Sequence, residues 1–171
     1  MFYCRKYIWP VLFIGVFFSA CGYRFSGSGN LPSGVETVFI EVLENRTVET
    51  GYESTVTNDL IYEFTRNGRA VQKSKDTTDA FLTGVIVSEH IRTISRQGQL
   101  DPLERRVQIT ISLKLTDRGD RVLWSRSGIS DSEAYDVGAN NQITERNKRL
   151  ALEILSRRLA ETAYNRLTDA F

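Results

Sequence analysis

The sequence predicts a single α+β domain built as a two-layer sandwich, with two helices packed on one face of a mostly antiparallel four-stranded sheet. The element order β-α-β-β-β-α follows from hydrophobic periodicity along the chain. Regular apolar and polar alternation marks residues 105–116, whereas residues 50–67 and 141–167 repeat apolar residues every three or four positions. The 171 residues are 41% hydrophobic and 25% charged, a composition typical of a globular domain with one core.

Residues 1–20 form a predicted signal peptide. The positive charges of Arg5 and Lys6 precede an almost unbroken apolar run, residues 7–18, which is followed by small residues. This run of about a dozen residues is shorter than the roughly 20 that a membrane-spanning helix requires. The segment is therefore expected to direct export and then to be removed.

Cys21 is the predicted site of lipid attachment. Phe18-Ser19-Ala20-Cys21 resembles a bacterial lipobox, in which the cysteine is acylated and becomes the mature N-terminus. The only other cysteine, Cys4, lies in the segment that would be removed, which disfavours a disulfide. Because several acyl chains hold a protein stably at a membrane, Cys21 predicts a lipid anchor. Gly22 replaces the Asp that retains enteric lipoproteins in the inner membrane, and by that analogy it indicates the outer membrane.

The folded domain is expected over residues 35–171. Residues 21–34 before it are interpreted as the acylated N-terminus and a flexible tether, because most of this segment is rich in serine and glycine. Residues 37–43 are β-branched or aromatic at most positions and predict a strand. Residues 50–67 predict an amphipathic helix, for which the Asn-Gly pair at residues 67–68 provides a C-terminal stop.

Three strands and a long helix are expected in the second half of the domain. Residues 80–94 alternate weakly, and residues 105–116 alternate with apolar residues at odd positions and polar residues at even positions. Residues 117–120 are typical of a turn, after which a returning strand begins at Val122. Residues 141–167 predict a helix that covers the sheet, so the other sheet face is expected to be exposed and polar.

Charge and residue counts exclude several functions. Lys plus Arg is 22 and Asp plus Glu is 21, a balance that disfavours nucleic-acid binding. A single histidine, His90, and two cysteines are too few for a zinc site. Although His90 lies beside Glu89 and could be a base or a metal ligand, a surface position is favoured, and no nucleophile or phosphate-loop motif occurs. We therefore expect no catalysis, no metal and no cofactor, and a monomer in isolation.

Arg92 and Arg96 are the candidate ligand-binding residues. They stand four positions apart, on one face of a regular strand, and lead into a glycine turn. Arginine binds phosphate with two parallel hydrogen bonds, so the pair is suited to an anionic headgroup. In the alternative interpretation they are solvated residues at a hairpin end, paired with Asp101 or Glu104.

Several motifs resemble the LptE family of lipopolysaccharide-assembly lipoproteins of the Gram-negative outer membrane. They are the Cys-Gly-Tyr-Arg-Phe sequence that starts at Cys21, the Leu-Pro pair at residues 31–32, and the Arg-Gln-Gly-Gln turn at residues 96–99. The order of elements through the last helix agrees as well. The resemblance covers the chain from Cys21 to about residue 167, and none of its motifs is a catalytic signature.

The resemblance implies a plug inside the LptD β-barrel that aids barrel assembly and lipopolysaccharide insertion and binds lipopolysaccharide directly. It places a basic lipopolysaccharide-binding residue on Arg96, and Arg92 is added as a candidate from its residue type and spacing alone. A second basic position has no clean match, because Thr144 falls there and Arg146 and Lys148 are only neighbours. The expected location is the periplasmic side of the outer membrane and the barrel lumen. The alternative is a pilot or accessory lipoprotein of another outer-membrane channel or secretin.

Overall fold

The structure is a computed structural model that describes residues 31–32, 34–97 and 101–171. The predicted signal peptide, residues 1–20, and the predicted acylation site, Cys21, lie outside the described residues. Both predictions therefore stay predictions.

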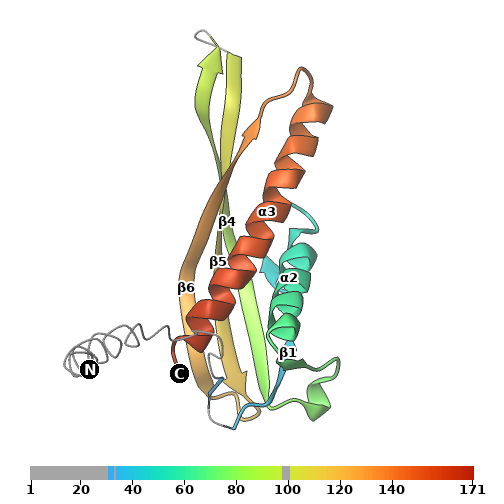
Figure 1. Cartoon of the computed structure of the whole chain (residues 1–171), viewed down its shortest axis with the longest axis vertical. Helices are drawn as coiled ribbons and strands as arrows, with labels where there is room; N and C mark the ends of the chain where they lie inside the picture. The colour runs from blue at the N-terminus through green and yellow to red at the C-terminus, as the bar shows by residue number, and fades with distance from the viewer. Residues whose placement is uncertain (1–30, 33, 98–100) are drawn as a thin grey trace, which may run out of the picture.

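The described chain has two layers, with α2 and α3 on one face of the sheet, as Figure 1 shows. This arrangement confirms the predicted α+β class. The elements follow the order β1 (Thr37–Ile40), β2 (Glu44–Asn45), α2 (Tyr52–Arg66), β3 (Ala70–Val71), the short 3-10 helix η2 (Lys75–Thr77), β4 (Ala80–Gln97), β5 (Asp101–Asp117), β6 (Val122–Asp136) and α3 (Asn141–Thr168).

The sheet has six strands rather than the predicted four. The additional strands, β2 and β3, are two residues long, and two residues carry no periodic signal that a sequence could reveal. Strand order is β3-β1-β4-β5-β6, and β2 also pairs with β4. β1 pairs in parallel with both β3 and β4, and β2 pairs in parallel with β4, whereas the long strands β4, β5 and β6 form the predicted antiparallel meander.

Alternation along β5 separates the two faces of the sheet as predicted. Its apolar side chains are buried beneath the helices, namely Val107, Ile109, Ile111, Leu113 and Leu115. The even-numbered residues of β5 point to the other side, which we call the outer face. Thr116, predicted on the wet face, is only 6% exposed, because Phe81 and Val122 flank it across the ladder.

The apolar core lies where both helices cover the sheet. From α2 it receives Val56, Leu60 and Phe64, and Phe64 meets the ring of Tyr164 on α3 edge to face at 5.1 Å. Leu31, in the segment expected to be a tether, is also buried in this core. The packed part of the chain therefore includes Leu31.

α3 begins with a defined cap. The side chain of Asn140 accepts a hydrogen bond from the backbone N–H of Ile143 at 2.9 Å. Gly138 just before it has no room for a side chain, since an added Cβ would lie 2.3 Å from Cγ2 of Ile143. None of the helices in the described part of the chain is both long and apolar enough to cross a membrane.

Candidate functional site

The long β4–β5 hairpin reaches beyond both helices at one end of the molecule. In Figure 1 the hairpin rises above the start of α3, while α2 lies in the lower half. Two regions result: a two-helix region, where α2 and α3 both cover the sheet, and a one-helix region, where α3 alone faces the hairpin. The candidate residues Arg92 and Arg96 both belong to the hairpin.

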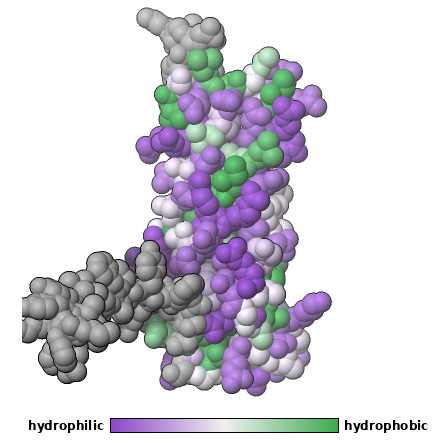
Figure 2. Space-filling view, in the orientation of Figure 1, coloured by the Kyte–Doolittle hydropathy of each residue, from purple (hydrophilic) through white to green (hydrophobic). Residues whose placement is uncertain are grey.

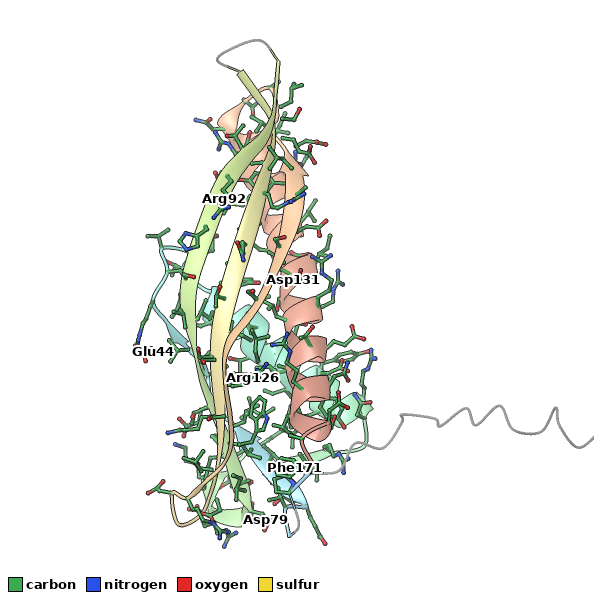
Figure 3. The ribbon with its side chains drawn as sticks, turned by 90° about the vertical axis from the view of Figure 1, so that its left-hand side faces the viewer. Glu44, Asp79, Arg92, Arg126, Asp131 and Phe171 are labelled. Carbon is green, nitrogen blue, oxygen red and sulfur yellow. The ribbon has the colours of Figure 1, made fainter. Side chains whose placement is uncertain are left out.

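Arg92 lies directly opposite Arg106 of β5 in the strand register. Both side chains are exposed, and no carboxylate of the described residues lies within ion-pair distance of either. Like charges that face each other across strands repel, so an anion bound between the two guanidinium groups would relieve the repulsion. Figure 3 shows Arg92 on the sheet, with α3 behind the strands.

Arg106 was not among the residues that the sequence singled out. Its position opposite Arg92 depends on the pairing register, which the sequence does not reveal. The only available signal was its even position in β5, which places it on the outer face.

The backbone of Arg96 lies in β4 opposite Pro102, and its side chain is outside the described residues. Two register shifts interrupt the ladder between Arg92 and Arg96. Regular alternation therefore does not extend from Arg92 to Arg96, and the expectation that both arginines share one face stays a prediction. Of the two carboxylates proposed as partners, Glu104 lies opposite Ser95 and makes no ion pair with Arg92, and the side chain of Asp101 is not described.

Apolar side chains accompany the arginines on the hairpin. Ile91, Ile94 and Leu103 are 44%, 41% and 44% exposed. Ile91 lies opposite the buried Val107 and so points to the other face from Arg92 and Arg106, while Ile94 and Leu103 lie at the register shifts beyond them. The hairpin end therefore exposes both cationic and apolar side chains, the kinds of group that an amphiphile with an anionic headgroup contacts.

Lys148 is buried in the seam between α3 and the sheet. Its Nζ lies 2.6 Å from Oε2 of Glu49 and 2.8 Å from Oε1 of Glu89. Burial alone would lower the pKa of Lys148, but the two carboxylates outweigh burial and raise that pKa to about 12. The contact with Glu89 has the distance of an ion pair without hydrogen-bond geometry, so its Oε1 lacks a hydrogen-bond partner within the described chain.

The three residues near the second basic position expected from the family differ in exposure. Lys148 is buried and forms ion pairs with Glu49 and Glu89. Thr144 is also buried, and its hydroxyl accepts from the N–H of Gly138 and donates to the carbonyl of Asn140. Arg146 alone of the three is exposed.

A second ion-pair cluster joins α3 to β6. Nε of Arg158 lies 2.5 Å from Asp131, and its Nη1 lies 2.8 Å from Glu133. Desolvation acts to lower the pKa of Arg158, and the hydrogen bonds and charges of the two carboxylates raise it. The guanidinium also donates to the carbonyl of Ser132 at 2.9 Å.

The remaining polar groups of the interior make structural contacts. The hydroxyl of Tyr52 donates to the carbonyl of Leu152 at 3.1 Å, and burial followed by nearby carboxylates raises the pKa of Tyr52. Ser156 donates to Asp59 across the two helices. His90 is exposed on the outer face opposite Gln108. Within the described ranges no group of three or more His, Cys, Asp or Glu residues could hold a metal ion.

The fold resembles that of several solved bacterial lipoproteins. Lipoprotein B from Nitrosomonas europaea superimposes with a TM-score of 0.61 at 13% identity, covering 85% of this chain and 88% of that one. A minor lipoprotein from Acinetobacter baumannii gives 0.54 at 14% identity, with coverage of 80% and 92%. Rare lipoprotein B from Shewanella oneidensis gives 0.53 at 11% identity, with coverage of 75% and 94%. No curated protein matches the chain in sequence.

The chain is therefore a two-layer α+β domain, and its fold is one that occurs in bacterial lipoproteins. The sequence model of one family, LptE, described as lipopolysaccharide-assembly, matches residues 35–167. The match covers most of the chain, and the chain belongs to this family.

Proposed function

We propose that the chain is a lipid-anchored plug and assembly partner of an LptD-type β-barrel in the outer membrane, without catalytic activity. The family match over residues 35–167 carries this proposal. The outer face of the sheet supports it, because a polar face suits a water-lined barrel lumen better than an apolar one. The lipid on Cys21 would confine the search for the barrel to the membrane surface.

Purification from outer membranes tests the partnership. A tagged chain is extracted in mild detergent, and the co-purifying barrel is identified by mass spectrometry. We expect the lipopolysaccharide translocon in equal amounts with the chain. Recovery of a secretin, or of no barrel, would overturn the proposal, and the secretin would favour an accessory lipoprotein of another channel.

We also propose that the hairpin binds lipopolysaccharide through its phosphates, with Arg92 and Arg96 as ligands and Arg106 completing the site. The support is the exposed Arg92–Arg106 pair on the outer face, which has no carboxylate partner among the described residues. Arginine and phosphate form charge-assisted hydrogen bonds that each contribute roughly 1.5–3 kcal/mol.

Charge reversal tests the ligand. Arg92→Glu, Arg96→Glu and Arg106→Glu are each compared with Lys114→Glu, which alters an exposed cation at the other end of the outer face. We expect about a tenfold loss of lipopolysaccharide binding for the hairpin variants and little change for Lys114→Glu. Equal binding by all four variants would contradict the assignment.

A further inference from the structure

The middle of the outer face carries neutral polar side chains from all three long strands. In the register, Thr110 lies between Ser88 and Ser130, and Gln108 lies between His90 and Ser132. We call the neutral residues of this surface the hydroxyl band, which consists of Ser88, Gln108, Thr110, Ser112, Ser130 and Ser132. The band lies on β5 and on the two strands that flank it, β4 and β6, all three of which Figure 3 shows.

None of the six side chains of the hydroxyl band makes a hydrogen bond to any other described residue. Five of the six are nevertheless half-buried on the sheet surface. The band therefore presents unused donors and acceptors on a shallow surface. A hollow of about 390 Å³ adjoins its lower end, with Val85 and Ser112 among the residues that line it.

The opposite side of the molecule has different chemistry. The solvent-facing side of α3 carries seven exposed charged residues, which are Glu145, Arg146, Arg149, Glu153, Arg157, Glu161 and Arg166. In Figure 2, where the strands lie on the left and the helices on the right, most of the visible surface is hydrophilic.

Desolvation distinguishes the two sides as docking surfaces. A charge that is buried without a matched partner costs several kcal/mol, whereas a hydroxyl that exchanges water for a partner's hydrogen bond costs almost nothing. A neutral polar partner therefore covers the hydroxyl band at a much lower cost than it covers α3.

We infer that the hydroxyl band is the surface by which the chain docks against its partner, and that the partner surface is neutral and rich in hydroxyl and amide groups. The charged side of α3 stays in water. The inference rests on the proposed function, in which that partner surface is the inner wall of the barrel, and it specifies which face meets the wall.

Photocrosslinking in cells tests the inference with the full chain. A photoreactive residue replaces Gln108, Thr110 or Ser112 in the band, and Arg149, Arg157 or Glu161 on α3 as matched controls. We expect adducts with the barrel from the band positions, in yields several times those from α3. Stronger adducts from α3, or band adducts with a second copy of this chain, would overturn the inference.

A charge in the band provides a second measurement. Thr110→Lys is expected to reduce the recovered barrel about tenfold, because the new ammonium would be buried without a partner. Arg157→Glu on α3 should leave recovery unchanged, and thermal unfolding of both purified variants separates misfolding from lost docking. Unchanged recovery with Thr110→Lys would contradict the inference.

The outcomes separate this inference from the proposed function. Adducts between the hydroxyl band and a secretin would support the hydroxyl band as the docking face but would refute an LptD-type barrel as the partner. Adducts with the expected barrel from α3 alone would retain the barrel and refute the docking face.

Discussion

The two-helix region and the one-helix region of the molecule are held together by different forces. In the two-helix region, α2 and α3 bury aliphatic and aromatic side chains against the sheet. In the one-helix region, Lys148 of α3 pairs with Glu89 of β4, close to the buried apolar residues Val107 and Tyr135. Apolar burial therefore dominates the two-helix region, whereas a buried ion pair adds a directional contact in the one-helix region.

The difference between the two regions suggests a division of roles: the two-helix region provides most of the stability, and the one-helix region carries the candidate ligand site. Apolar packing tolerates small shifts, whereas an ion pair with one buried ammonium and two carboxylates requires a defined geometry. The candidate ligand site lies on the hairpin of the one-helix region, where α2 contributes no cover. Four predictions, from the largest expected effect to the smallest, test this division.

Leu159→Ala should give the largest loss of stability. Leu159 is fully buried in the two-helix region, and truncation leaves a cavity. We expect the free energy of unfolding to fall by about 3 kcal/mol in urea titrations. Leu150→Ala, at an exposed position of the same helix, is the control and should cost less than about 0.5 kcal/mol. A cost for Leu159→Ala as small as that of the control would show that the apolar core does not dominate stability.

Lys148→Met should destabilise the one-helix region by about 2–3 kcal/mol, because it leaves the buried carboxylate of Glu89 without its counter-charge. Adding Glu89→Leu should recover at least half of the loss, since an apolar pair can replace a buried ion pair. Urea unfolding of the single and double variants checks both values. A double variant less stable than the single one would show that the pair is not the cause.

Alkaline pH should weaken the same contact. The pKa of Lys148 is raised from its usual 10.5 to about 12 in the folded chain. A raised pKa stabilises the fold fully below 10.5, and this stabilisation, roughly 2 kcal/mol, is lost as the pH rises toward 12. The difference in unfolding free energy between the native chain and Lys148→Met should therefore shrink over this interval. A constant difference would refute the assignment.

Arg158→Ala should have the smallest effect, about 0.5–1 kcal/mol. The side chain of Arg158 is 41% exposed, so water and salt screen its pairs with Asp131 and Glu133. The effect should fall further in 1 M NaCl, where the Debye length is about 3 Å. Thermal unfolding at low and high salt measures the loss of stability and its salt dependence. A loss larger than that caused by Lys148→Met would contradict the ranking of the two ion-pair clusters.

Periodicity in the sequence was sufficient to predict the long strands and helices. The alternation over residues 105–116 and the apolar repeat over residues 141–167 report backbone geometry directly, and both elements are confirmed. The short strands β2 and β3 were missed, because two residues carry no period.

The candidate site was predicted less completely than the fold. Arg92 was found from its residue type and spacing, but its partner Arg106 required the strand register. The Lys148 cluster joins a loop, a strand and a helix, so no local pattern contains it. The register shifts near Arg96 likewise arise from strand pairing rather than from local sequence.

The position of α3 in the chain has a consequence for biosynthesis. α3 is 28 residues long and follows every strand of the sheet, so it leaves the ribosome after the meander that it covers. Until then the apolar side of β5 has no cover from α3, and a chain in this state is prone to aggregate. A slow or interrupted synthesis of α3 would therefore prolong the time for which the nascent chain depends on chaperones.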